Sequence, residues 1–308
     1  MNLNFLFWLI CATFKEMIQQ IVGTFPKKYE QADYLVDQIK RSLQKYKRNA
    51  YIPVVEDDDG SLLDSKFGGT PYMRKEDKWP ICGCGYPTEF GVQINLDTLP
   101  FNNGEFGTGI LQFWKCPLDC DSNDSEMVRV IVPNDVGNKV PISDINQWQY
   151  EIGIKKLLEP RSLHCLHGDG FMSSDINELV GFYRNRHTEP HFLPKRIISW
   201  VREDDYPDLE EIEEEDLEEE IWEKHEKYNC WNYGLEGEKM GGWSHWYDRF
   251  GDEYKYPKCP ICEEEMTTLL LKMGENSKIH KWELTDSTAN IYQCPRHKEQ
   301  VKYMLFGC

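Results

Sequence analysis

The sequence has few positive charges for its acidic content. Its 308 residues include 35 Lys and Arg against 53 Asp and Glu, which gives a formal net charge of −18 at pH 7. Proteins that bind nucleic acid do so largely through Lys and Arg on the phosphate backbone, so this balance argues against a nucleic-acid partner. An acidic surface fits a basic protein or peptide as partner. Solubility alone is the other explanation of the charge.

The sequence also lacks a hydrophobic run long enough to span a membrane. The apolar stretch at residues 5–14 is well short of the ~20 residues that a transmembrane helix needs. No Lys or Arg precedes this stretch and Lys15 follows it, whereas a secretory signal carries its positive charge first. We therefore interpret residues 1–24 as an apolar extension, either a helix that packs on the core or the product of an early start codon. A cleaved signal is the alternative.

Signatures of catalysis are absent as well. The Gly-Gly pairs at 68–69 and 241–242 are too short for a phosphate-binding loop and lack its Lys-Ser/Thr ending. We expect them in turns that need positive φ. A polar run contains His164, His167 and Asp169, but no partner base is evident for it. The sequence predicts no catalytic and no cofactor-binding residue and favours a protein that is not an enzyme.

Eleven cysteines are present, and most of them fall into two sets with a similar spacing. The sets are Cys82, Cys84, Cys116 and Cys120, and then Cys259, Cys262, Cys294 and His297. In each set, 32 positions separate the second residue from the third. Four thiolate or imidazole groups suit tetrahedral zinc, and a site closed by four protein ligands is structural rather than catalytic. The sequence therefore predicts one or two structural zinc ions held by these residues.

Two other interpretations of the cysteines remain open. Disulfides are one, although the short C-x-C and C-x2-C spacings suit a shared ion better than bridges to distant partners. Reduced thiols left from an ancestral site are the other. The preference for metal over disulfides favours a reducing compartment, and we predict a cytoplasmic protein.

The chain shows signs of an internal duplication. Lys-Phe-Gly-Gly at 66–69 recurs as Lys-Met-Gly-Gly at 239–242, and Trp-Pro-x-Cys at 79–82 recurs as Tyr-Pro-x-Cys at 256–259. Duplicated units commonly pack about a pseudo-two-fold axis. We therefore expect two similar lobes with a cleft between them.

Hydrophobic periodicity predicts many strands and two helices. Apolar runs and alternation predict strands at 90–94, 110–114, 128–132 and 301–306. Apolar residues at helical spacing, among them Ile39 and Leu43, predict an N-terminal helix that begins near 24–26. The Glu-rich stretch 203–220 predicts a solvated helix with a thin apolar seam.

We therefore predict an α+β fold, with an internally duplicated, strand-rich core, an N-terminal helix and an acidic helix between the repeats. The expected segments are the extension 1–24, the N-terminal helix and turn 25–60, the first repeat with a middle segment 61–200, the acidic helix 201–235 and the second repeat 236–308.

A series of short motifs runs through the chain in a fixed order. They are Ser-Lys-Phe-Gly-Gly-Thr-Pro-Tyr at 65–72, Trp-Pro-x-Cys at 79–82, Val-Gln-Ile-Asn-Leu at 92–96, Ile-Ser-Trp at 198–200, Asp-Tyr-Pro at 205–207, Lys-Met-Gly-Gly at 239–242 and Ile-Tyr-Gln-Cys-Pro-x-His at 291–297. In this order the motifs resemble the YwqG-like family, whose function is unknown. The resemblance covers roughly residues 27–308. This chain departs from the family pattern at Lys272, where Gln is frequent, and at 285–289, which replaces a glycine-rich strand entry.

The repeat unit of that family is similar to the N-terminal region of programmed cell death protein 2, in a group called TYPIN. Members of the group are implicated in escorting a ribosomal protein. The resemblance implies a protein- or peptide-binding module that acts like a chaperone for a basic partner. The alternative is an enzyme of unknown reaction, with an active site in the cleft between the repeats.

Overall fold

The computed structural model describes nine segments of the chain. The described residues are 36–83, 87–117, 126–133, 190–207, 234–244, 256–274, 277–282, 284 and 287–307. The chain divides into two units, one formed by Met1–Arg48 and Asp205–Leu235, the other by Asn49–Asp204 and Glu236–Cys308.

Several predicted features lie outside the described residues. They include the extension 1–24, most of the predicted acidic helix 201–235, and the polar run with His164, His167 and Asp169.

The first unit contains the helix that apolar spacing predicts. Residues 36–42 are helical, and the 3-10 helix η1 (Gln44–Tyr46) follows. Ile39 and Leu43, which are four positions apart on one helical face, are fully buried, and this part of the prediction is confirmed. Among the described residues, none of the helical segments has the length and apolar character to cross a membrane.

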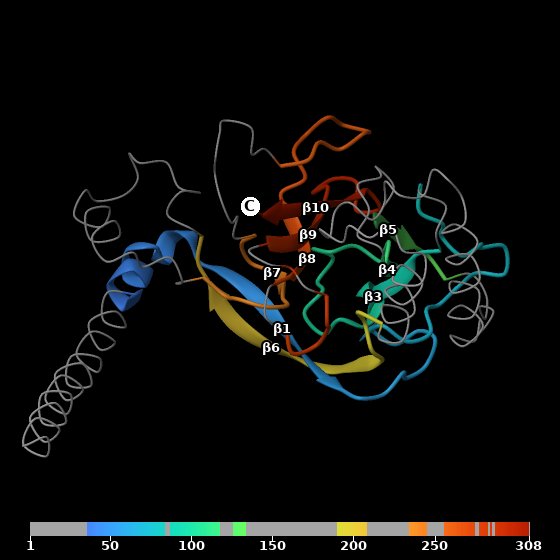
Figure 1. The fold of residues 1–308 in the computed structure, drawn as a ribbon. Helices are drawn as coiled ribbons and strands as arrows, with labels where there is room; N and C mark the ends of the chain where they lie inside the picture. The colour runs from blue at the N-terminus through green and yellow to red at the C-terminus, as the bar shows by residue number, and fades with distance from the viewer. Residues whose placement is uncertain are drawn as a thin grey trace, which may run out of the picture. The chain divides into compact units, whose positions relative to one another are not determined.

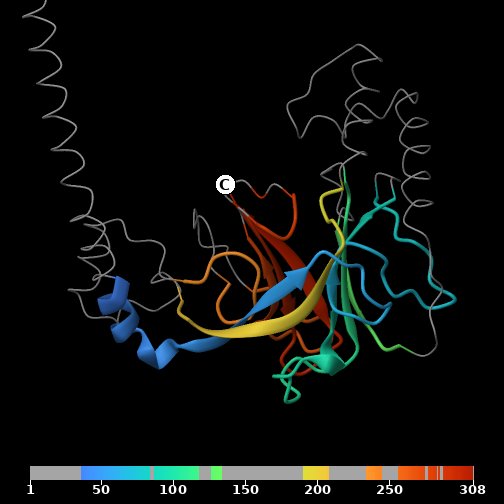
Figure 2. The same cartoon turned by 90° about the horizontal axis from the view of Figure 1, so that it is seen from below.

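The second unit is built from two β-sheets (Figures 1 and 2). The strands are β1 (Arg48–Glu56), β2 (Lys66–Phe67), β3 (Glu89–Asn95), β4 (Ile110–Lys115), β5 (Glu126–Ile131), β6 (Lys195–Asp205), β7 (Met240–Gly241), β8 (Thr268–Met273), β9 (Ser287–Gln293) and β10 (Val301–Gly307), with the 3-10 helix η2 (Leu96–Thr98) after β3. One sheet has the order β5-β4-β3-β2-β6-β1-β7, and the other has the order β10-β9-β8. The seven-stranded sheet is curled, and Figure 2 shows its long strands β1 and β6 running side by side.

One hydrophobic core joins the two sheets. Val92 and Phe113 of β3 and β4 belong to the same buried cluster as Leu271 and Ile291 of β8 and β9. The ring of Phe113 stacks on Tyr303 of β10 with centroids 5.2 Å apart. Burial of large apolar and aromatic side chains on facing strands is the dominant favourable contribution to this packing.

The other face of β3 and β4 is covered by the loops on either side of β2, residues 57–65 and 68–80, which are bound through polar side chains. Gln93, Gln112 and Arg129 lie opposite one another on β3, β4 and β5. Gln112 Nε2 donates to Oε1 of Gln93 at 3.0 Å, and Arg129 Nε donates to Oε1 of Gln112 at 3.0 Å. We call these three side chains the polar ladder. It reaches into the loop, because Gln112 Nε2 also donates to the carbonyl of Tyr72 at 2.7 Å and Arg129 Nη2 donates to Asp77 at 3.0 Å.

Two sets of strands in this unit have corresponding registers. β2 pairs with β3, β3 with β4 and β4 with β5, all antiparallel. In the same way Lys239, next to β7, pairs with β8, β8 with β9 and β9 with β10. The register of β3 and β4 shifts between Phe90 and Val92, and that of β8 and β9 shifts between Leu269 and Leu271. Each strand set therefore carries an irregularity at a similar place in its second strand.

The Gly-Gly pairs open the two strand sets in the same backbone conformation. Gly68 and Gly69 have φ of 56° and 73°, and Gly241 and Gly242 have φ of 69° and 75°. The predicted positive φ at these glycines is confirmed. A Cβ at Gly68 would lie 2.2 Å from the carbonyl oxygen of Phe192, so backbone approach also requires glycine there.

The described residues are richer in strands than an α+β fold implies. The sequence predicts helix and turn over 25–60, but β1 occupies Arg48–Glu56 within this segment. Ala50 and Pro53 of β1 are buried, and pairing in the sheet stabilises the extended backbone there. Likewise β6 continues to Asp205, so residues 201–205 are strand where the predicted acidic helix begins. Sheet neighbours on both sides of β6 outweigh the local helical preference of an acidic sequence.

Candidate metal centre

The first half of the candidate metal centre is a tight hairpin before β8. Lys258 and Glu265 form an antiparallel bridge that closes the turn carrying Cys259 and Cys262. Within the turn, the N–H of Cys259 donates to the carbonyl of Glu264 at 2.9 Å, and the N–H of Glu263 donates back to the carbonyl of Cys259 at 2.9 Å. These bonds close the turn that carries both cysteines.

The second half is the turn between β9 and β10. Cys294 follows the last residue of β9, and its N–H donates to the carbonyl of Gln300 at 3.0 Å. The N–H of Gln300 donates to the carbonyl of His297 at 2.8 Å, and the N–H of His297 donates to Cys294 Sγ at 3.3 Å. The chain reversal therefore turns the His297 ring back toward the cysteine.

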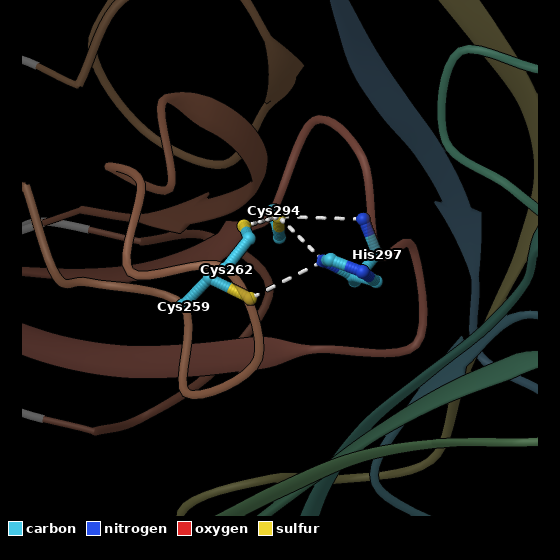
Figure 3. A group of neighbouring side chains, drawn as sticks. All are labelled: Cys259, Cys262, Cys294 and His297. Atoms are coloured by element: carbon cyan, nitrogen blue, oxygen red, sulfur yellow. Dashed lines mark hydrogen bonds between the residues drawn. The ribbon is translucent and has the colours of Figure 1, made fainter.

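The four side chains converge on one point (Figure 3). Their ligand atoms all lie within 4.8 Å of one another. Cys262 Sγ is 3.6 Å from Cys294 Sγ, and His297 Nδ1 is 3.6 Å from Cys259 Sγ and 3.7 Å from Cys294 Sγ. Two sulfurs bound to tetrahedral zinc at ~2.3 Å are separated by roughly 3.8 Å. Cys259, Cys262, Cys294 and His297 can therefore hold a metal ion, and their geometry is compatible with zinc.

Backbone N–H groups in the hairpin favour the thiolate form that binds metal. A hydrogen bond from the backbone N–H of Glu264 lowers the pKa of Cys262. Burial opposes ionisation of Cys259, but hydrogen bonds from the backbone N–H groups of Cys262 and Ile261 outweigh it and lower the pKa of Cys259. Burial raises the pKa of Cys294. A bound cation would compensate for that burial, because metal binding is coupled to loss of the thiol proton.

The surroundings of the four ligands are apolar on the protein side. Cys259 and Cys294 belong to a buried cluster with Met266, Leu269 and Tyr292. On the solvent side, exposed Arg296 Nη2 lies 2.5 Å from Glu264 Oε1, which links the two halves of the site at its rim. The cysteine and histidine spacing predicts the four donors but does not reveal this ion pair. Arg296 is the variable residue of Cys-Pro-x-His, and nothing in the sequence pairs it with Glu264, which lies outside the Cys-Pro-x-Cys motif.

The first cysteine set is only partly described. Cys82 and Cys116 are both buried and form no disulfide, whereas Cys84 and Cys120 lie outside the described residues. The backbone around Cys82 resembles the Cys259 hairpin. Ile81 and Pro87 form an antiparallel bridge, and the N–H of Thr88 donates to the carbonyl of Pro80 at 3.1 Å. Cys82 therefore lies beside a bridged turn like that of Cys259, and the convergence of the four residues of the first set stays a prediction.

Comparison with known families gives one match over most of the chain. Residues 65–294 match a domain of unknown function, DUF1963. The chain belongs to the DUF1963 family. A comparison with curated proteins gives no match. In this DUF1963 protein, the matched region contains the cysteines of both sets and ends at Cys294, three positions before His297.

Proposed function

We propose that this protein is a zinc-stabilised binding module for a protein or peptide, with a structural zinc ion held by Cys259, Cys262, Cys294 and His297. The observation that carries the proposal is the convergence of four soft donors within 4.8 Å. Four protein ligands fill a tetrahedral site and leave no position for a catalytic water. The ion would join the hairpin before β8 to the turn between β9 and β10.

We further propose that the two strand sets descend from a duplication and that Cys82, Cys84, Cys116 and Cys120 form a second zinc site. Corresponding strand order, register shifts and glycine conformations support the duplication. The similar hairpins at Cys82 and Cys259 support the second site. The match to DUF1963 is consistent with the YwqG-like resemblance, and the likeness to the N-terminal region of programmed cell death protein 2 belongs to the same proposal.

The partner class follows from charge. A net charge of −18 steers association toward a basic protein or peptide and disfavours nucleic acid. A chaperone-like role in the cytoplasm fits a module that shields a positively charged client. Attraction of this kind weakens with salt, because the Debye length shortens from ~10 Å at 0.1 M to ~3 Å at 1 M.

Metal content of the purified full chain tests the zinc sites. We expect two zinc ions per chain by elemental analysis, one in Cys294→Ser and one in Cys116→Ser. Cys230→Ser, which changes a cysteine outside both sets, is the matched control and should keep both ions. A wild-type chain without zinc would refute the proposal. A wild-type chain with a single ion, which Cys116→Ser keeps and Cys294→Ser loses, would confine the proposal to the second set.

Affinity capture with the full chain tests the partner. We expect reproducible recovery of basic proteins, binding of the leading one after purification, and weaker binding as salt rises. A purified partner that is acidic, or binding unaffected by salt, would contradict the charge argument while leaving the zinc sites untouched.

A further inference from the structure

The three sulfurs of the candidate metal centre differ in how much solvent reaches them. Cys259 and Cys294 are 1% and 0% exposed, whereas Cys262 is only half-buried. A side-chain hydrogen bond to Cys262 raises the pKa of Arg296, whose side chain is 58% exposed. Cys262 is therefore the sulfur at the solvent rim of this centre, where a small dissolved reagent meets it first.

Cys294 is placed to react with Cys262. The two Sγ atoms lie 3.6 Å apart (Figure 3), whereas Cys259 Sγ lies 3.6 Å from His297 Nδ1. A disulfide has an S–S bond of ~2.05 Å, so the two sulfurs need to approach by roughly 1.5 Å. The centre therefore combines an accessible sulfur with a second sulfur close to it, which is the arrangement of redox-sensing cysteines.

We propose that the metal centre is a redox switch, in which hydrogen peroxide oxidises Cys262 and Cys294 to a disulfide and the centre releases its ion. This inference rests on the proposed function, because it takes zinc to be held by the second set. A metal-bound cysteine is a thiolate, which is the form of cysteine that peroxides oxidise. Disulfides in a reducing compartment are usually transient and catalytic or redox-sensing, which fits such a switch.

The oxidation has two steps. In the first, Cys262 Sγ attacks one oxygen of hydrogen peroxide, the O–O bond breaks and hydroxide leaves, so that Cys262 becomes a sulfenic acid. In the second, Cys294 Sγ attacks Cys262 Sγ, the S–S bond forms, the S–O bond breaks and a second hydroxide leaves. Two protons from solvent convert the hydroxides to water. The two sulfurs together lose two electrons, and the peroxide gains them.

The disulfide leaves too few donors for the ion but keeps the three-stranded sheet joined. Only Cys259 and His297 remain as ligands from the second set, and a structural zinc site needs four. The new bond links the hairpin before β8 to the turn between β9 and β10, the same two segments that the ion would join. Metal release by oxidation should therefore leave the sheet folded, whereas metal release by a chelator under reducing conditions should loosen it.

Peroxide treatment of the full Cys116→Ser chain tests the switch, because this variant should keep only the ion of the second set. We expect release of this ion and a Cys262–Cys294 cross-link that a thiol reductant reverses. Trypsin cuts after Lys272 and Lys281, so this cross-link joins two peptides, and fragmentation in the mass spectrometer assigns the bridged cysteines. If the variant does not fold, the wild-type chain gives the same cross-link.

The outcomes separate the switch from the proposed function. A chain without zinc before treatment would overturn both. Zinc that stays bound under peroxide, zinc loss with no disulfide, or a disulfide that includes Cys259 would overturn the switch and leave the zinc site in place. Cys230→Ser, which changes a cysteine outside both sets, is the matched control and should respond to peroxide as the wild type does.

Thiol labelling and hydrogen exchange test the two remaining steps. A limiting amount of N-ethylmaleimide should label Cys262 of the zinc-loaded chain at least about tenfold faster than buried Cys259. After peroxide treatment the backbone amides of β9 and β10 should keep the protection that they have in the zinc-loaded chain, whereas chelation with a reductant present should lower it. Equal labelling of the two cysteines, or equal loss of protection by both treatments, would contradict the switch.

Discussion

Replacing Gln112 by Leu should destabilise the second unit strongly, because this side chain is the centre of the polar ladder. Gln112 is fully buried, donates to the carbonyl of Tyr72 and to Gln93, and accepts from Arg129. Two neutral hydrogen bonds contribute ~1 kcal/mol each, and the one from the guanidinium contributes ~2 kcal/mol. Burying the leucine side chain offsets roughly 1 kcal/mol of this loss. The free energy of unfolding should therefore fall by about 3 kcal/mol.

Urea unfolding followed by tryptophan fluorescence measures this change. For a domain of this size the same loss corresponds to a midpoint temperature lower by roughly 6–12 °C. Gln44→Leu is the matched control, because Gln44 is exposed and its side chain donates to the hydroxyl of Tyr206 at 2.8 Å in the first unit. Gln44→Leu should lower the free energy of unfolding by no more than ~1 kcal/mol. If Gln112→Leu lowered the free energy of unfolding as little as Gln44→Leu, the polar ladder would not hold the loop 68–80 on the sheet.

Three further predictions follow from other contacts. Treatment with a zinc chelator, or the substitution Cys294→Ser, should speed hydrogen exchange of the backbone amides in β9 and β10 more than in β1 and β6. An equal increase in all four strands would show that the metal centre does not stabilise the three-stranded sheet. Gly68→Ala should lower the midpoint temperature of thermal unfolding clearly more than Gly104→Ala. Both glycines have positive φ, but only a Cβ at Gly68 would clash, at 2.2 Å from the Phe192 carbonyl oxygen. Equal decreases in the two variants would contradict the steric argument. Burial opposes ionisation of Asp77, but hydrogen bonds from Arg74 and the charge of Arg129 outweigh it and hold the pKa of Asp77 below its ordinary 3.8. The stability it contributes is therefore present above about pH 4 and is lost as the pH falls through the lowered pKa. Asp77→Asn should flatten the acid limb of a stability–pH curve, and an unchanged limb would contradict this assignment.

The convergence of the four residues of the second set is predictable from the sequence because their spacing is local. Cys-Pro-x-Cys and Cys-Pro-x-His each place two donors on one turn, and 32 positions supply the hairpin that brings the turns together. The strands at β3, β4, β5 and β10 are also predictable, since each contains a run of β-branched, aliphatic or aromatic residues.

The strand β1 and the buried polar groups are not predictable in this way. Lys115 looks like a surface residue in sequence, and its burial depends on Trp282, which is distant along the chain. His280 likewise gains its surroundings from Phe192 and Glu238. Local periodicity carries no information on such long-range contacts, and the same holds for the three positions of the polar ladder.

The position of β1 bears on how a fragment of this protein should be chosen for study. In the sheet order, β1 separates β6 from β7, although it precedes residue 65 in the chain. A fragment cut at the limits of the family match, 65–294, would lose this internal strand, the last strand β10, and His297 of the candidate metal centre. Expression boundaries for the β-rich unit should therefore enclose residues 48–307, which contain all of β1 and β10. A shorter piece would leave unpaired strand edges that can pair with neighbouring molecules and cause aggregation.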